Sequence, residues 1–257
     1  MFIPRLVAFD LDDTLAPSKS AIDPRIGDAL AALAARVDVA IISGGQLSQF
    51  MAQVVDRLPA MEASARARFH LMPTCGTQYY RLSPDGVETI YTRSLTDDQK
   101  RRALTAVEEE ARRLGLWEAD RGWGEILEDR GSQITFSALG QAAPVDAKSL
   151  WDPSGEKKNA LRAAVAARLP DLEVRSGGST SVDITERGID KAYGMTRLAE
   201  QTGIPLDEML FVGDRLDENG NDYPVLAMGV RCLAVTGWED TAAQLAELIP
   251  GLPLPTP

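Results

Sequence analysis

Four short stretches of the chain are apolar at consecutive positions, a pattern typical of parallel strands that are buried on both faces. These stretches are Leu6–Phe9, Val39–Ile42, Met209–Val212 and Cys232–Val235. Helical patterns lie between and after them, and one begins at Asp23 and Pro24, an N-cap residue followed by a first-turn proline. This alternation predicts an α/β fold with a Rossmann-like, doubly wound parallel sheet.

The middle of the chain has a different pattern. Residues Gln133–Ala138 and Ser181–Thr185 alternate between polar and apolar, as half-exposed antiparallel strands do. A helix is expected after Thr96–Gln99, which has the sequence of a capping box. We therefore predict a core domain of residues 1–83 and 187–257 and an inserted α+β domain of residues 84–186.

The composition limits the classes of function. With 44% hydrophobic and 25% charged residues, the sequence is typical of an ordinary globular protein. No stretch approaches the ~20 apolar residues of a membrane-spanning helix, and the N-terminus lacks a signal-peptide pattern, so we expect a cytoplasmic protein without a membrane partner. A net charge of -11 argues against nucleic acid as a partner. Nothing in the sequence decides the oligomeric state, and a homodimer stays open.

A single histidine, His70, lies in a strand-like segment, and two cysteines have no paired spacing. The histidine is expected to be structural, and the cysteines form neither a disulfide framework nor a zinc cluster. If the protein is an enzyme, carboxylates and lysine must therefore carry the catalysis.

Polar residues follow each predicted strand, at the edge where open parallel sheets bind ligands. The first strand is followed by Asp10 and Asp12, the second by Ser43–Gly45, and the third by Asp214 and then Asp222. Two carboxylates ~4 Å apart repel by about 4 kcal/mol at an effective dielectric constant of 20, so such a cluster requires a cation or a raised pKa. Oxygen donors without histidine or cysteine select a hard ion, and we predict Mg²⁺.

The acidic segment permits two other interpretations. Residues 217–222 resemble a calcium loop, but aligning Gly220 with the loop glycine places Leu226 where a bidentate acid is required. The segment is also compatible with an acidic turn around Asn219-Gly220, a common hairpin dipeptide. The sequence leaves the second interpretation open.

Lys191 lies at the predicted start of a helix that runs to Gln201 and is ended by Gly203. The helix dipole disfavours a positive charge there, so an anion facing Lys191 explains its position better than solvent does, although a solvated lysine stays the alternative. Ser43–Gly45 precede another helix and offer backbone N–H groups that suit a phosphate.

These motifs resemble, in order, the four motifs of the haloacid dehalogenase superfamily. They are Asp10–Leu15, Ser43, Lys191, and Gly213-Asp214 with Asn221-Asp222. An α+β insertion between the second and third motifs resembles the cap-bearing sugar-phosphatase branch, subfamily IIB. Within it the chain is most similar to the eukaryotic-type phosphomannomutases, through Gly213–Asp222, Gly177-Gly178 with Ser181 and Asp183, and Arg130–Gln141.

The resemblance implies a role for each matching residue. Asp10 would be the nucleophile that becomes an aspartyl phosphate, and Asp12 the general acid and base. Ser43 and Lys191 would hold the phosphoryl oxygens, with Gly44 and Gly45 beside them. The Mg²⁺ would be held by Asp10, the backbone carbonyl of Asp12 and Asp214, with Asp222 in the outer shell or bound directly. The insertion would be a mobile cap that delivers Arg130, Ser181 and Asp183 to the sugar end of a small phosphorylated substrate.

The same resemblance bears on the net reaction. A mutase holds a second phosphate with three arginines; here Arg130 is kept, Gln141 stands at the second position, and the third falls near Lys148. We therefore predict a phosphatase acting on sugar phosphates rather than a phosphohexomutase, the main alternative. A third class, a catalytically inactive sugar-phosphate binding module, is disfavoured because Asp10 and Asp12 are both present.

Overall fold

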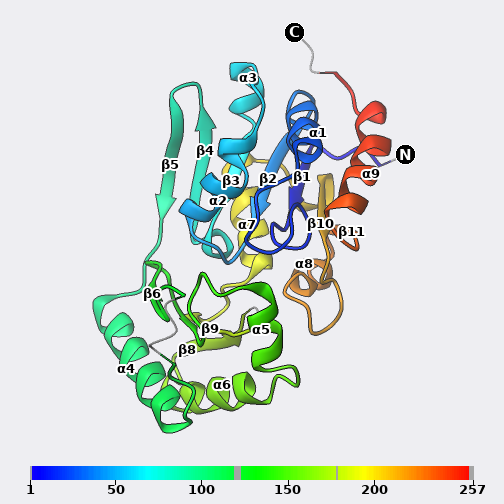
Figure 1. Cartoon of the computed structure of the whole chain (residues 1–257). Helices are drawn as coiled ribbons and strands as arrows, with labels where there is room; N and C mark the ends of the chain where they lie inside the picture. Colours follow the sequence, from blue (N-terminus) through cyan, green and yellow to red (C-terminus); the bar gives the residue numbers. More distant parts are fainter. Residues whose placement is uncertain (1, 119–122, 178, 255–257) are drawn as a thin grey trace. The chain divides into compact units, whose positions relative to one another are not determined.

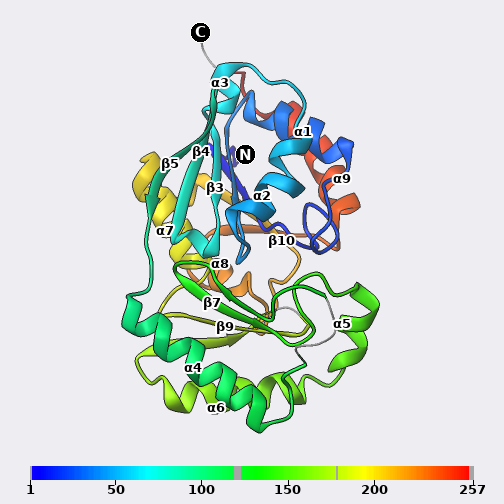
Figure 2. The ribbon, with the colours of Figure 1, turned by 60° about the vertical axis from the view of Figure 1, so that its left-hand side comes forward.

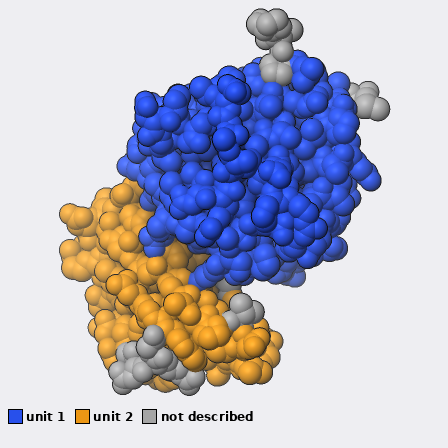
Figure 3. Space-filling view, turned by 45° about the horizontal axis from the view of Figure 1, so that its top comes forward, with its two compact units in different colours: residues 1–92, 190–257 blue, residues 93–189 orange. Residues whose placement is uncertain are grey.

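The computed structural model describes residues 2–118, 123–177 and 179–254, which fold into two compact units. Unit 1 comprises Met1–Thr92 and Asp190–Pro257, and unit 2 comprises Arg93–Ile189 (Figure 3). The sequence placed the boundaries at 83/84 and 186/187. The units instead change after residue 92 because strand β5 pairs with β4 in the sheet of unit 1.

Unit 1 is built on a seven-stranded sheet with the order β11-β10-β1-β2-β3-β4-β5 (Figure 1). The first five strands in this order are parallel, and β4 and β5 form an antiparallel hairpin beside β3. Four of the parallel strands match the predicted apolar stretches. The strands are β1 (Leu6–Phe9), β2 (Asp38–Ile42), β3 (Phe69–Met72), β4 (Gln78–Ser83), β5 (Gly86–Thr92), β10 (Met209–Gly213) and β11 (Arg231–Ala234).

Helices cover both faces of this sheet. Alternate residues of β1 point to opposite faces, so that Val7 and Phe9 pack with α1, α2 and α9, whereas Leu6 and Ala8 pack with α7 and α8. Figure 2 shows α7 on one side of the sheet and α1, α2 and α9 on the other. The predicted doubly wound α/β fold is confirmed. The helices are α1 (Pro24–Ala34), α2 (Leu47–Gln53), α7 (Lys191–Thr202), α8 (Tyr223–Ala227) and α9 (Trp238–Leu248).

Local sequence explains where the helices begin and end. The Asp23 side chain accepts a hydrogen bond from the Arg25 N–H group and Pro24 opens α1, as predicted. Asp190 caps α7 by accepting from Tyr193 N–H, and Gly203 ends the helix with φ 68°. Short helical turns connect the elements: η1 (Val55–Arg57), α3 (Ala63–Arg66), η2 (Thr74–Gly76), η4 (Leu206–Glu208) and η5 (Ile249–Gly251).

Unit 2 is a four-stranded antiparallel sheet with the order β6-β7-β9-β8. Helices α4 and α6 lie on one side of β7 and β9 (Figure 2), where Ile134, Phe136 and Ile184 join their apolar residues in a core. The capping box of Thr96 and Gln99 opens α4, as predicted. The elements are α4 (Asp97–Arg113), β6 (Leu127–Asp129), β7 (Gln133–Ser137), α5 (Val145–Trp151), α6 (Glu156–Arg168), β8 (Leu172–Ser176) and β9 (Ser181–Glu186).

The two ends of unit 2 are joined by a salt bridge between Arg93 and Glu186. Within the described residues, no helix combines the length and the apolar character that crossing a membrane requires.

Candidate active site

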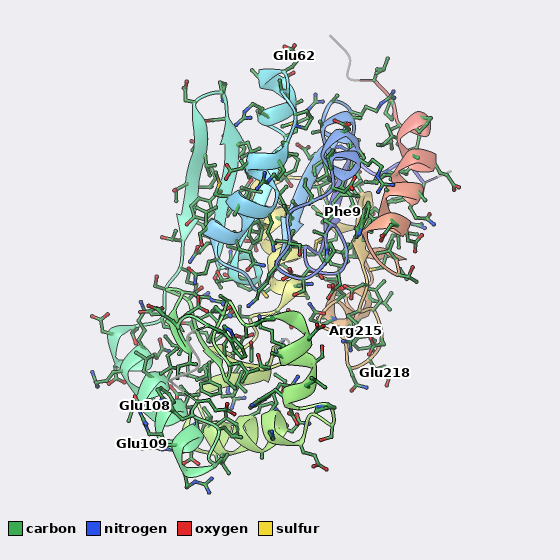
Figure 4. All side chains as sticks on the ribbon, viewed as in Figure 1. Phe9, Glu62, Glu108, Glu109, Arg215 and Glu218 are labelled. Carbon is green, nitrogen blue, oxygen red and sulfur yellow. The ribbon has the colours of Figure 1, made fainter. Side chains whose placement is uncertain are left out.

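The carboxyl ends of the unit 1 strands bring together a buried charged cluster. Asp10 continues β1, and its N–H group donates to the Val212 carbonyl oxygen of β10 (3.0 Å). The Lys191 Nζ atom, at the first residue of α7, lies 2.6 Å from Asp10 Oδ1 and 2.5 Å from Asp222 Oδ1. Lys191 is 2% exposed and Asp222 is fully buried, so this ammonium group is held by carboxylates rather than by solvent. Figure 4 labels Phe9 and Arg215, the chain neighbours of Asp10 and Asp214.

Asp10, Asp214 and Asp222 each place one carboxylate oxygen within 4.8 Å of the others. The Thr14 hydroxyl donates to Asp214 Oδ1 (3.0 Å), and the Arg215 N–H group donates to Asp222 Oδ2 (3.0 Å). When ionised, the three carboxylates and Lys191 carry a net charge of -2 (three negative and one positive). Oxygen donors with excess negative charge fit a hard divalent cation such as Mg²⁺.

The acidic segment does form a turn around Asn219-Gly220, in which the Gly220 N–H group donates to the Asp217 carbonyl oxygen (2.7 Å). This turn is not a β-hairpin, because β10 and β11 are parallel, and Asp214 and Asp222 on either side of it join the charged cluster. A side chain at Gly213 would collide with the Asp222 carboxylate and with Phe211, so glycine is required for Asp222 to approach the strand end.

Burial raises the pKa of Asp10 to about 8, with Lys191 opposing this effect and Asp222 adding to it. Burial alone would lower the pKa of Lys191, but the charges of Asp10 and Asp222 more than reverse this and raise it. A nucleophilic carboxylate must be ionised, so a cation bound beside Asp10 would favour its reactive form.

The Asp12 side chain makes contacts of its own, separate from this cluster. Its Oδ1 atom accepts a hydrogen bond from Lys19 N–H (2.7 Å), and its Oδ2 atom accepts one from Gln49 Nε2 (3.1 Å). Sequence reasoning did not identify Gln49 as part of the site. The only indication of its role in the sequence was its position near the start of the helix that follows Ser43–Gly45.

Ser43 directly follows β2, the neighbour of β1 in the sheet, and is 5% exposed. The hydroxyl of Ser43 accepts from the N–H group of Gly45 (3.2 Å), so this N–H already has a partner in the loop that was expected to bind phosphate. The Ser43 hydroxyl accepts in this contact, so its own O–H group can still donate to another acceptor.

A strained turn holds this loop. Thr74 (φ 48°) and Cys75 (φ 56°) both adopt left-handed backbone angles, which are rare for residues other than glycine. Thr74 N–H donates to the Gly45 carbonyl oxygen (3.0 Å), and Cys75 N–H donates to the Ser43 carbonyl oxygen (2.9 Å). A Cβ atom on Gly194 of α7 would lie 2.9 Å from the Cys75 carbonyl oxygen. The turn thus packs against both the Ser43 loop and the helix that begins with Lys191.

In unit 2, the predicted sugar-binding residues belong to a polar network. Asp183 Oδ1 accepts from Thr135 Oγ1 (2.8 Å) and from Gln133 Nε2 (3.0 Å). Burial raises the pKa of Asp183, and the charge of Arg130 opposes this effect. Ser181 Oγ lies 3.2 Å from Ser137 Oγ. Thr135 and Asp183 are paired across β7 and β9, so these groups lie on the polar face of the sheet, opposite the core.

Glu128, which the sequence analysis did not single out, connects the other predicted residues of unit 2. Its Oε2 atom accepts from Arg130 Nη2 (2.8 Å) and also from the Gln141 amide. Lys148 Nζ donates to the Gln141 carbonyl oxygen (3.0 Å). The three positions at which the resembled family has arginines, here Arg130, Gln141 and Lys148, are therefore brought together, and Glu128 contacts the first two of them. Gly178, part of the predicted motif, lies outside the described residues.

Comparison with known proteins identifies a family that this chain matches in sequence. A sequence model described as "Eukaryotic phosphomannomutase" matches residues 26–250. The chain is 23% identical over 231 residues to Phosphomannomutase 1 of Mus musculus, covering 86% of this chain and 83% of the mouse protein. It is 25% identical over 252 residues to the phosphomannomutase of Saccharomyces cerevisiae, covering 95% of this chain and 93% of the yeast protein.

Solved structures with a similar fold include a haloacid dehalogenase-like hydrolase from Bacteroides thetaiotaomicron, with a TM-score of 0.66. It is 15% identical in sequence, and the match covers 95% of this chain and 99% of that one. An IMP-bound mutant of the Plasmodium falciparum IMP-nucleotidase gives a TM-score of 0.72 at 14% identity, with 96% of this chain matched to 66% of that one. At these identities the structures show the fold alone.

Proposed function

The chain belongs to the eukaryotic phosphomannomutase family, within the haloacid dehalogenase superfamily, and from that premise we propose that it transfers the phosphoryl group of sugar phosphates to Asp10. The observation that carries the proposal is the buried cluster in which Lys191 bridges Asp10 and Asp222 beside Asp214. Such a cluster, with its excess negative charge, costs stability unless a cation balances it, and Mg²⁺ bound there would also attract a phosphate group.

The residues of unit 1 account for each part of the transfer. Asp10 attacks phosphorus, and the leaving sugar oxygen takes a proton from Asp12; water then attacks the aspartyl phosphate while Asp12 takes the proton back. Lys191 and the Ser43 hydroxyl hold phosphoryl oxygens. A Mg²⁺ ion held by Asp10, Asp214 and Asp222 would neutralise charge between the nucleophile and the phosphate.

We propose further that the net reaction is hydrolysis and that unit 2 supplies the residues that select the sugar. Retaining a bisphosphate requires unpaired positive charge, yet the charge of Arg130 is compensated by Glu128, and Gln141 contributes an amide without charge. The formal charges of Arg130, Lys148, Glu128 and Asp183 sum to zero, which suits hydroxyl groups better than a second phosphate.

Phosphohexomutase activity is the second candidate. The family match over residues 26–250 and the names of the similar proteins favour it over hydrolysis. The predicted cytoplasmic location and the Mg²⁺ requirement belong to both candidates.

The first experiment tests Asp10. A panel of phosphosugars is assayed for phosphate release with Mg²⁺, using the wild-type protein and Asp10→Asn, which keeps the volume of the side chain but removes the nucleophile. We expect release by the wild type only; release by the variant would exclude Asp10 as the nucleophile, and absence of both release and isomerisation in the wild type would favour the inactive binding module.

The second experiment separates hydrolysis from isomerisation. Hexose 1-phosphate is supplied with and without a trace of hexose bisphosphate, and free phosphate is followed against hexose 6-phosphate. We expect phosphate release to dominate in the wild type, and Gln141→Arg to shift the ratio toward isomerisation by about tenfold or more, because each charge-assisted hydrogen bond contributes about 1.5 to 3 kcal/mol. Gln141→Leu is the matched control. Bisphosphate-dependent isomerisation that outpaces phosphate release in the wild type would establish the mutase instead.

A further inference from the structure

Both carboxylate oxygens of Asp12 are occupied by N–H donors from different elements. The Lys19 backbone N–H group binds Oδ1 at 2.7 Å, and the Gln49 side-chain amide binds Oδ2 at 3.1 Å. An amide N–H group can only donate, so the Gln49 contact requires an oxygen of Asp12 that accepts. Together with the Lys19 contact, the Gln49 contact therefore holds the Asp12 side chain in one fixed orientation.

The Gln49 side chain is itself held in place. Its Nε2 atom also donates to Gln53 Oε1 (3.3 Å), and Gln53 is 4% exposed. A Cβ atom at position 45 would collide with the Gln49 amide, so Gly45 leaves the space that this side chain occupies. The donor that reaches Asp12 is thus held from α2 by Gln53 and occupies the space that a side chain at position 45 would fill.

We propose that Gln49 is a positioning residue that prepares Asp12 for the hydrolytic half of the reaction, an inference that rests on the proposed function. In that half, the water oxygen forms a bond to phosphorus, and the bond between phosphorus and the Asp10 oxygen breaks with its electron pair returning to Asp10. The proton lost by water goes to Asp12, which must begin this step as a correctly oriented carboxylate. In the first half Asp12 instead gives a proton to the leaving oxygen, and a leaving group of low basicity such as p-nitrophenolate needs little of this help.

The asymmetry between the two halves gives a measurable signature. We expect Gln49→Met, which keeps the length of the side chain but removes the donor, to lower steady-state phosphate release by about tenfold to a hundredfold, the range for a hydrogen bond to a charged group. Formation of the aspartyl phosphate should change by less than about threefold. The variant should therefore accumulate phosphorylated Asp10 during turnover.

The experiment uses the full chain with Mg²⁺ and p-nitrophenyl phosphate. Rapid mixing measures the burst of p-nitrophenol, steady-state release gives turnover, and acid quenching followed by mass spectrometry gives the fraction of phosphorylated Asp10. Gln49→Lys returns a donor and should restore release to within about threefold of the wild type. The matched control is Gln244→Met, because Gln244 makes a similar amide contact to Asp240 (3.4 Å) on α9, away from the site.

The outcomes separate this inference from the proposed function. Phosphate release by Gln49→Met within about twofold of the wild type would overturn the positioning role, as would equal losses of the burst and of turnover. A Gln49→Lys variant no faster than Gln49→Met would also count against a donor at this position. If the wild type forms no phosphorylated Asp10, the proposed function itself has failed.

Discussion

Replacing Lys191 by methionine tests how the buried charged cluster is balanced. Lys191 contacts Asp10 and Asp222 at 2.6 and 2.5 Å, and neither carboxylate has access to much solvent. Breaking a buried ion pair costs about 3 to 5 kcal/mol. Two carboxylates left within 4.8 Å of each other repel by a further about 3 to 4 kcal/mol at an effective dielectric constant of 20, unless one of them takes up a proton.

We therefore expect Lys191→Met to lose about 3 to 5 kcal/mol of the free energy of unfolding at pH 7.5 without metal. In the variant, the charge of Lys191 no longer opposes the effect of burial, so the pKa of Asp10 rises further above its usual range. The pKa of Asp10 then lies above both pH values in both proteins, so each gains stability as the pH falls from 7.5 to 5.5, by up to about 2.7 kcal/mol for one proton over two pH units. The difference between the two proteins should therefore be similar at pH 7.5 and at pH 5.5.

Urea unfolding of both proteins at the two pH values measures the difference, and hydrogen exchange of β1 and β10 reports on unit 1 separately from unit 2. The matched control is Lys100→Met, which removes the exposed pair between Lys100 and Asp129 (3.0 Å) and should cost less than about 1 kcal/mol. A loss below about 1 kcal/mol for Lys191→Met, or a wild-type stability that falls as the pH is lowered from 7.5 to 5.5, would refute this account of the cluster.

Three further predictions concern other groups. Gly213→Ala should cost about 1 to 3 kcal/mol in urea unfolding and should lower phosphate release, because its methyl group displaces the Asp222 carboxylate; a fully active variant would contradict the close approach. The raised pKa of Asp183 means that its ionised form lowers stability at neutral pH, so the wild type should gain stability relative to Asp183→Asn as the pH falls from 7 toward 4; parallel pH curves would show that Asp183 is not perturbed. Chelation with EDTA should stop phosphate release and lower the melting temperature, since a divalent cation offsets the net charge of the cluster; unchanged turnover would rule out the predicted metal site.

The sequence was sufficient wherever the deciding interaction was local. The strands β1, β2, β10 and β11 were predicted within about two residues because uninterrupted apolar runs mark strands buried on both faces. The N-cap of α1 and the capping box of α4 were predicted because they involve neighbours in the chain. Asp10, Asp214 and Asp222 could be expected to meet because parallel strands end at one edge of the sheet.

The features that were missed depend on which distant groups meet. Strand β5 of the β4–β5 hairpin was assigned to the insertion, whereas it belongs to the sheet of unit 1. The position of this hairpin is decided by the pairing of β3 with β4, for example His70 with Arg81, and not by the sequence pattern of the hairpin itself. Glu128 lies 13 residues from Gln141, and nothing in either segment signals their contact. The contact between Gln49 and Asp12 likewise has no signal in the sequence. The left-handed backbone angles of Thr74 and Cys75 could not be predicted either, because no local preference of these residues favours them.

The salt bridge between Arg93 and Glu186 means that the chain leaves for unit 2 and returns from it at one place. An insertion with adjoining ends behaves like a long loop, and the entropy of closing a loop grows only slowly with its length. Segments of quite different size and sequence could therefore occupy this position without disturbing β5 or α7, between which it is inserted. If unit 2 selects the sugar as proposed, exchange of the insertion would give the proposed phosphoryl-transfer centre different sugar specificities during evolution, and would offer the same route to protein engineers.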